Sequence, residues 1–177
     1  MRKIILNLAV SLDGFIAGPN GEYDWCLTDA DYGMTEFLQS VDCTLMGRKT
    51  FDLLGKYGDP FKHLTHHVFS RTVKESSISN VRLVSDDLLT YTKNLTHQPG
   101  KNIWLFGGSE IIDPLVQENL VDEFILSTHP VLLGDGIPLF KKSNERKNLK
   151  LIDTKSYPSG LVPVSYTHLT LPTKRIV

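Results

Sequence analysis

The chain has 177 residues, of which 41% are hydrophobic and 22% charged, and its 19 Lys and Arg nearly balance its 20 Asp and Glu. This length suffices for one domain whose core needs neither disulfides nor metals, and the composition excludes disordered and fibrous proteins. A formal net charge of -1 provides no general attraction for nucleic acid or anionic membranes, so any cationic site must be local.

The first part of the chain predicts a strand, a long loop and a helix. Residues 3–11 are β-branched and leucine-rich, which predicts a buried strand too short for a signal peptide or membrane span. The sequence GPNG at 18–21 predicts a loop of a length typical of lids. Apolar residues at helical spacing predict a helix over 29–40, capped by Asp29 or Asp31. Two cysteines without CxxC spacing favour a reducing cytoplasm.

Strands and helices alternate through the middle of the chain. We expect further strands at 42–46, 67–70, 81–84, 102–108 and 122–134, and helices at 49–54, 88–97 and 109–119. Gly55 should end the second helix, and Pro114 should lie near the first turn of the last one. Two final strands, 149–157 and 160–166, should form an antiparallel hairpin.

The pattern predicts an α/β fold in which a mostly parallel sheet has helices on both faces and an antiparallel C-terminal edge. No repeat or linker divides the chain, so residues 1–166 are expected to form a single domain. Residues 167–177 have neither periodicity nor helix caps and are expected to be an unstructured tail or a segment foreign to the natural chain.

Two strand-to-helix junctions carry the residue types of a phosphate site. Ligands of parallel sheets bind beyond the carboxyl ends of the strands, where helix-start amides lack partners. The first junction is Gly47, Arg48, Lys49 and Thr50, and the second is Gly107, Gly108, Ser109 and Glu110. Neither matches GxGxxG or the Walker A motif, which disfavours a standard dinucleotide fold and an NTPase.

A third strand end carries Ser70 and Arg71, where a guanidinium beside a hydroxyl suits a phosphomonoester. The alternative for Arg71 is a solvated surface arginine. His63, His66 and His67 have the spacing of metal ligands, but they fall in a predicted loop without a nearby cysteine, so we expect no metal. His129 is expected to be a core or interface histidine.

Four ordered motifs, MGRKTFD, FGGSEII, SLDGFIAGPNGEYDW and PVLLGDGIPLF, resemble the dihydrofolate reductase-like superfamily. Within it the chain is most similar to the reductase domain of bacterial riboflavin biosynthesis and its stand-alone relatives. The resemblance spans about residues 3–166. It implies an eight-stranded, mostly parallel sheet and NADPH as the hydride donor.

The resemblance also assigns roles to residues. It implies that the two glycine junctions bind the cofactor phosphates, that Ser70 and Arg71 bind the 2′-phosphate, and that Ala17, Gly18 and Asn20 belong to a mobile loop over the nicotinamide. Trp25 would lie near the substrate. The GDG turn that contains Gly136 could also border the substrate pocket, although a glycine-rich turn between strands explains it without a function.

A carboxylate on the first helix anchors the substrate in the folate enzymes, and Asp31 lies nearest to that position, with Asp29 and Glu36 as competitors. Burial would raise the pKa of such a carboxyl group and suit it to protonate nitrogen. The riboflavin-pathway enzymes do not rely on this carboxylate. The sequence therefore predicts an NADPH-dependent reductase of a pyrimidine-type or dihydrofolate-type substrate, or a nucleotide-binding module without turnover. A homodimer is expected, without nucleic-acid or membrane partners.

Overall fold

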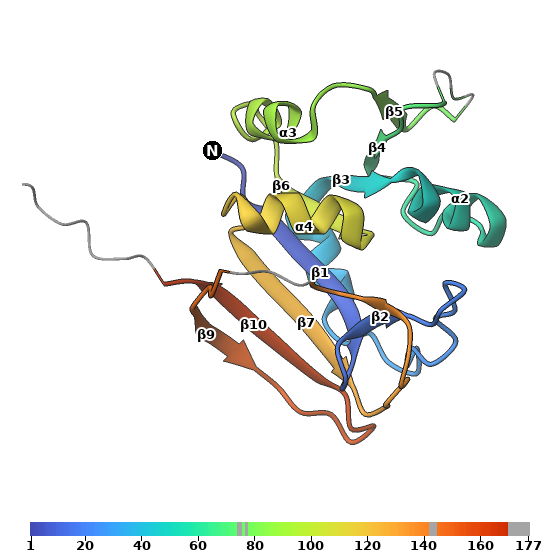
Figure 1. Ribbon diagram of the computed structural model, residues 1–177, viewed down its shortest axis with the longest axis vertical. Coiled ribbons are helices and arrows are strands. Elements are labelled where there is room, and N and C mark those ends of the chain that lie inside the picture. Colours follow the sequence, from blue (N-terminus) through green and yellow to red (C-terminus); the bar gives the residue numbers. More distant parts are fainter. Residues whose placement is uncertain (74–75, 77, 142–144, 170–177) are drawn as a thin grey trace, which may run out of the picture.

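The computed structural model describes residues 1–73, 76, 78–141 and 145–169 (Figure 1). The strands are β1 Ile4–Ser11, β2 Phe15–Ala17, β3 Val41–Gly47, β4 Thr65–Phe69, β5 Val81–Val84, β6 Asn102–Gly107, β7 Glu123–His129, β8 Ile137–Pro138, β9 Leu149–Thr154 and β10 Val162–His168. The helices are α1 Met34–Ser40, α2 Arg48–Tyr57, α3 Leu88–Thr96 and α4 Ser109–Gln117. No helix in the described ranges is long and apolar enough to cross a membrane.

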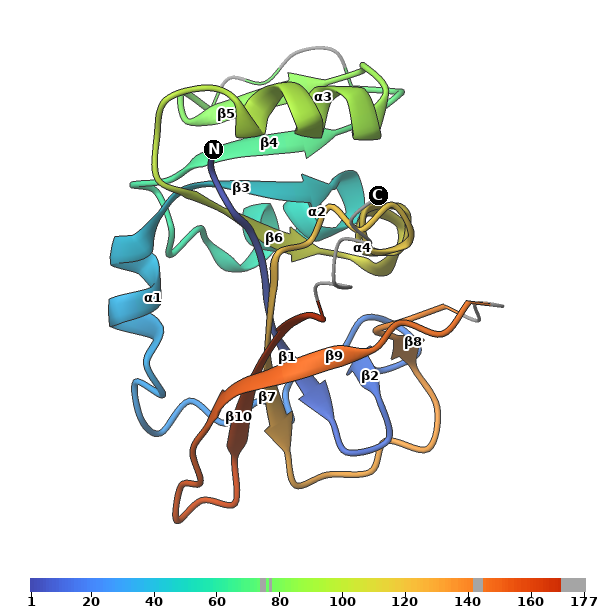
Figure 2. The same cartoon turned by 90° about the vertical axis from the view of Figure 1, so that its left-hand side faces the viewer.

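Eight strands form one sheet in the order β5-β4-β3-β6-β1-β7-β10-β9. Five of its neighbouring pairs, from β5–β4 through β1–β7, are parallel, whereas β10 is antiparallel to both β7 and β9. The sheet twists so strongly that β3 and β4 run across Figure 2 while β1 and β7 run down it. The predicted parallel sheet with an antiparallel C-terminal hairpin is therefore confirmed.

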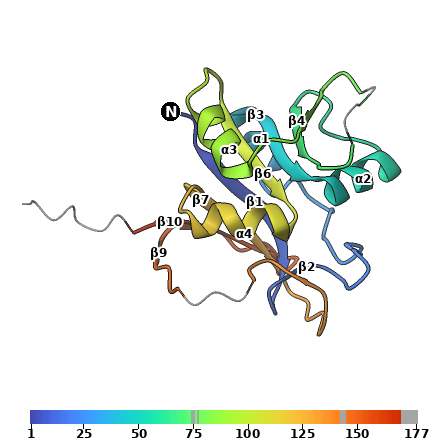
Figure 3. The ribbon, with the colours of Figure 1, turned by 45° about the horizontal axis from the view of Figure 1, so that its top comes forward.

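Helices cover both faces of this sheet, as predicted. On one face, α3 and α4 bury a core that includes Leu6, Leu45, Leu105 and Leu115 (Figure 3). On the other face, Phe37 of α1 packs edge-on against Trp104 of β6, with ring centroids 5.2 Å apart. Burying aromatic and aliphatic side chains on both faces is the main source of stability for such a sheet.

The loop after β2 is longer than predicted, because α1 begins at Met34 rather than near Asp29. Tyr32 and Gly33 adopt left-handed φ values of 52° and 84°, which a helix cannot include. The next helix, α2, does not end at Gly55 but continues to Tyr57, and Gly58, with φ 87°, follows it. An interior glycine weakens a helix by only about 1 kcal/mol, so it does not have to end one.

The predicted position of Pro114 and the predicted C-terminal boundary of the domain were also wrong. Pro114 lies in the second turn of α4. The carbonyl group that loses its donor there belongs to Glu110, which is exposed, so water can satisfy it. At the C-terminal end, β10 continues through Thr167 and His168, two residues beyond the predicted domain boundary, and residues 170–177 of the predicted tail lie outside the described ranges.

His66 and His67 lie in β4 and both are buried, so His67 is in a strand as the range 67–70 predicted, whereas His66 is not in the expected loop. The Nδ1 atom of His66 is 2.8 Å from the Thr44 hydroxyl, and its Nε2 atom is 3.1 Å from Asp59. His67 Nδ1 is 2.7 Å from the Tyr91 hydroxyl, and burial, reinforced by Arg82, lowers the pKa of His67 to about 4. Both ring nitrogens of His66 and the Nδ1 atom of His67 thus have hydrogen-bond partners.

Candidate functional site

Three strands of the parallel part of the sheet end side by side. Gly47 of β3 is in register with Phe69 of β4, and Met46 of β3 with Gly107 of β6. The residues that follow each strand therefore meet at one edge. This arrangement brings together the three predicted phosphate-binding segments, which lie far apart in the sequence.

The helices that start at this edge lack side-chain caps. Gly47 is the N-cap of α2 and Gly108 the N-cap of α4, and neither helix start has a side-chain hydrogen bond to its amides. The first amides of a helix have no intrahelical acceptor, and the helix dipole makes this end positive. Both starts can thus donate hydrogen bonds to an anion.

The glycines allow these two helix starts to approach each other. A Cβ atom placed on Gly108 would lie 3.6 Å from Thr50 Oγ1, and one on Gly47 would lie 3.3 Å from Ile111 Cγ1. Gly107 has a φ of 107°, and the peptide between Gly107 and Gly108 is cis. Gly107 is buried and Gly47 and Gly108 are half-buried, and because glycine has no Cβ atom a ligand can approach the backbone closely where α2 and α4 start.

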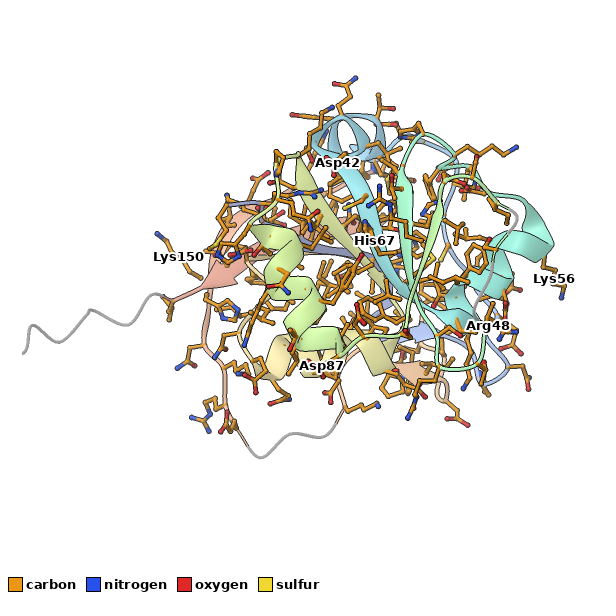
Figure 4. The ribbon with its side chains drawn as sticks, turned by 90° about the horizontal axis from the view of Figure 1, so that it is seen from above. Asp42, Arg48, Lys56, His67, Asp87 and Lys150 are labelled. Atoms are coloured by element: carbon orange, nitrogen blue, oxygen red, sulfur yellow. The ribbon has the colours of Figure 1, made fainter. Side chains whose placement is uncertain are left out.

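Arg48 links the first junction to the segment after β4. Its Nε atom donates to both Asp52 carboxylate oxygens at 3.1 Å, and its Nη1 atom donates to Thr72 Oγ1 at 3.2 Å. Figure 4 shows Arg48 at the start of α2 on the outside of the molecule. A guanidinium has five N–H donors, so these contacts leave donors for a ligand.

Ser70 and Arg71 have different environments. Ser70 is buried, and its Oγ atom accepts hydrogen bonds from the amides of Thr72 and Val73, so it shapes the turn and keeps its own hydrogen to donate. Arg71 is exposed and has no hydrogen bond or ion pair with any of the residues that the structure describes. Arg48 and Arg71 therefore place two cations around one turn.

The remaining residues of the predicted phosphate site contribute in different ways. Lys49 and Glu110 are exposed, whereas Ser109 is half-buried. The carboxylate of Glu110 would repel a phosphate, so only its backbone amide suits the predicted role. Its negative charge in the first turn favours α4 itself.

Ala17 does not lie in a loop as expected, because it forms part of β2 and pairs with Ile137 of β8. A Cβ atom on Gly136 would overlap the Ala17 carbonyl oxygen. The glycine is thus explained by backbone packing, and its predicted contact with substrate stays a prediction. Gly18 and Asn20 do lie in the loop, where the side-chain amide of Asn20 donates to Glu22 at 2.7 Å.

Asp31 lies before α1 and is exposed. One carboxylate oxygen accepts hydrogen bonds from the Thr35 amide and hydroxyl, and the other from the Gly33 amide. The hydrogen bond from the Thr35 hydroxyl leads the contacts that lower the pKa of Asp31, which is the opposite of the expected effect of burial. Asp29 and Glu36 are also exposed, so none of the three candidate carboxylates lies in a water-poor pocket.

The sequence singled out Trp25 and His129 separately, but it did not predict the contact between them. Trp25 is half-buried, and its ring meets that of His129 edge-on, with centroids 5.3 Å apart. His129 is buried at the end of β7, and its Nε2 atom has no hydrogen-bond partner among the described residues. A histidine at the end of an apolar strand, directly before a proline, was the signal that could have revealed it.

Between the loop and α2 the surface is hollowed. The hollow has a volume of about 480 Å³ and is lined by Asn20, Gly21, Glu22, Tyr23, Asp24, Leu53 and Lys56. It is open rather than enclosed, so a ligand there would remain in contact with water.

Comparison with known proteins identifies the family. The sequence model of the RibD C-terminal domain family matches residues 2–162. The chain is 47% identical over 179 residues to the uncharacterized protein YyaP of Bacillus subtilis (strain 168), a match that covers 93% of this chain and 94% of YyaP.

Solved structures share the fold. The crystal structure of a putative riboflavin biosynthesis protein from Shewanella sp. PV-4 has a TM-score of 0.84 and 26% identity, and the match covers 96% of this chain and 100% of that one. A Thermotoga maritima diaminohydroxyphosphoribosylaminopyrimidine deaminase/5-amino-6-(5-phosphoribosylamino)uracil reductase has a TM-score of 0.73 and 15% identity, and the match covers 95% of this chain and 57% of that one. With a family model spanning nearly its whole length, the chain belongs to the RibD C-terminal domain family.

Proposed function

We propose that this protein is an NADPH-dependent reductase that transfers a hydride to a small heterocyclic substrate of the pyrimidine type. The observation that carries the proposal is the convergence of two uncapped helix starts, α2 and α4, beside Arg48 and Arg71. A dinucleotide phosphate needs amide donors for its diphosphate and a cationic fork for its phosphomonoester. The sheet edge offers both within one short stretch of surface.

The residues fit such a cofactor. The backbone at Gly47 and Gly107–Gly108 would hold the diphosphate, since glycines without a Cβ atom let it lie close to the first amides of α2 and α4. Arg48, Ser70 and Arg71 would hold the 2′-phosphate, while Ala17 and Gly18 would border the nicotinamide. When bound, a dihydronicotinamide supplies the hydride, and the protein supplies orientation and a surface from which water is excluded.

The exposed carboxylates favour a pyrimidine-type substrate over a dihydrofolate-type one. Folate enzymes use a carboxylate on the first helix, and here Asp31 is engaged by Thr35 and Gly33 in water. The Thermotoga maritima protein of the same fold is named a 5-amino-6-(5-phosphoribosylamino)uracil reductase, which makes that compound the first substrate to test. Dihydrofolate is the second.

The test of the cofactor assignment is the Arg48→Ala variant. A hydrogen bond to a charged group contributes about 1.5–3 kcal/mol, so we expect the Kd for NADPH to rise about 10- to 100-fold, and that for NADH less than about threefold. The titrations follow NADPH and NADH fluorescence. Lys150→Ala is the matched control, because it removes an exposed cation from β9 on the opposite side of the molecule (Figure 4).

Three outcomes would change the proposal. Equal weakening of NADPH and NADH would move Arg48 to the diphosphate that both share. Failure of the wild type to bind either nucleotide would refute the cofactor assignment. Tight NADPH binding without loss of absorbance in the presence of either substrate would favour the alternative function, a nucleotide-binding module without turnover.

A further inference from the structure

The two central strands β1 and β7 present polar residues on the face of the sheet that carries α1. Ile5 and Ile125 belong to the hydrophobic cluster of that face, so by strand alternation Asn7, Ala9 and Ser11 of β1 and Ser127 and His129 of β7 share it. Ser11 is in register with His129, and Ala9 with Ser127. The polar positions thus lie towards the carboxyl ends of both strands.

No helix in the described part of the chain covers this part of the face. Figure 2 shows α1 apart from the ends of β1 and β7. Ala9 and Ser127 are small and only half-buried although they lie in the middle of an eight-stranded sheet. A flat ligand could therefore lie on these two residues, between the sheet and the loop that contains Trp25.

His129 is the polar residue best placed to form a hydrogen bond with such a ligand. Its side chain is 3% exposed, and its Nδ1 atom is 2.8 Å from the Ser127 carbonyl oxygen. A carbonyl oxygen only accepts, so Nδ1 carries the hydrogen, and in the neutral ring Nε2 is left as a bare acceptor. Buried polar atoms nearly always have a partner, yet this Nε2 has none among the described residues.

Trp25 is the group that covers the imidazole. Its ring stands nearly perpendicular to that of His129, at an interplanar angle of 89°. The indole is held by a long hydrogen bond of 3.3 Å from its Nε1 atom to the Glu22 carbonyl oxygen, within a loop that has no regular structure. Because Trp25 belongs to the loop, displacing its side chain from His129 would leave the pairing of β1 and β7 intact.

We propose that His129 is a substrate-recognition residue, whose Nε2 atom accepts a hydrogen bond from a ring N–H or amino group of a flat heterocycle that displaces Trp25. The inference takes the class of ligand, a flat heterocycle, from the proposed function. It adds the residue that distinguishes among such ligands. A heterocycle without an N–H donor would leave Nε2 buried and unpaired, so His129 discriminates against it.

The test uses two planar pyrimidines of similar size, 6-aminouracil, which has N–H donors, and 1,3,6-trimethyluracil, which has none. In the wild type, long-range ¹⁵N NMR should show Nδ1 protonated and Nε2 bare, and the Nε2 resonance should shift when 6-aminouracil is added. Trp25 fluorescence should change in the same titration. A free protein with the hydrogen on Nε2, or an Nε2 resonance that stays unchanged while 6-aminouracil binds, would overturn the proposal.

Variants give a second, independent readout. The preference for 6-aminouracil over trimethyluracil should fall by about fivefold to tenfold in His129→Phe, which keeps a ring against Trp25 but loses the acceptor. His129→Gln, which offers an amide oxygen, should keep part of the preference. His63→Gln, at an exposed position before β4, is the control and should keep all of it.

A wild-type preference in His129→Phe would overturn the inference, and so would the absence of saturable binding of 6-aminouracil to the wild type. These titrations contain no nicotinamide nucleotide. The NADPH assignment, tested through Arg48, and the role of His129 can therefore fail separately. The wild-type NMR experiment stands even if His129→Phe does not fold.

Discussion

Gly136→Ala separates a packing role for this glycine from a ligand-binding one. The new methyl group would overlap the Ala17 carbonyl oxygen and lie 3.3 Å from Phe15 Cβ, so β2 and β8 would have to separate. Overpacking of this kind costs about 1–3 kcal/mol, and the strained backbone adds about 1 kcal/mol. For a domain of this size each kcal/mol lowers Tm by about 2–4 °C, so a fall of about 5–15 °C is expected.

Gly134→Ala is the matched control in the same turn. Gly134 has a φ of 76°, but a Cβ atom there would meet nothing within 4 Å. Its cost is that of the left-handed backbone alone, about 1 kcal/mol, or a fall in Tm of about 2–4 °C. Equal Tm values for the two variants in differential scanning calorimetry would refute the packing explanation. A Gly136→Ala protein as stable as the control but unable to bind 6-aminouracil would instead place Gly136 in the substrate pocket.

Three further predictions concern acid stability, Asp31 and assembly. Because burial lowers the pKa of His67, the unfolded chain binds the proton more tightly, and the free energy of unfolding should fall by about 2–3 kcal/mol as the pH falls from about 7 to about 4.5. Urea unfolding should show that this loss largely vanishes in His67→Gln and persists in the control His63→Gln. Asp31→Ala should leave turnover of a pyrimidine-type substrate within about twofold of the wild type, and a loss of about a hundredfold or more would restore its predicted catalytic role. We propose that Leu151 and Ile152, which are 51% and 52% exposed on edge strand β9, form part of a homodimer interface. Leu151→Asp should then lower the mass measured by light scattering to that of a monomer, and an unchanged dimer mass would contradict this interface.

The two glycine junctions could be predicted as helix starts because their signals are local. A glycine that ends an apolar strand and precedes a helix pattern marks a helix start without a side-chain cap, and both Gly47 and Gly108 are such N-caps. The parallel topology then places the ends of β3, β4 and β6 at one edge without further information. The contact between Arg48 and Thr72 follows from this topology.

The errors arose where tertiary contacts override local patterns. Tyr32 adopts a left-handed conformation because its hydroxyl group bonds to Ser159 and its ring packs against Tyr157 of the distant hairpin. Strands β2 and β8, with three and two residues, are too short to show a periodicity. Their pairing depends on the close approach of Gly136 to Ala17, which no local pattern encodes.

For a related reason, the residues that we propose to contact the substrate could not be predicted from the sequence. The alternation of side chains along β1 predicts that Asn7, Ala9 and Ser11 share one face of the sheet. It does not predict which helix or loop packs against that face, or which strand pairs with β1. That information comes from the pairing of Ser11 with His129, two residues separated by most of the chain. The sequence therefore favoured Asp31, the carboxylate nearest to the position of the one that the folate enzymes use. The structure gives that carboxylate hydrogen-bond donors of its own and leaves a buried imidazole nitrogen without a partner among the described residues. Since an unpaired buried acceptor gains more from a ligand donor than a solvated, already bonded carboxylate does, His129 is the better candidate for substrate recognition.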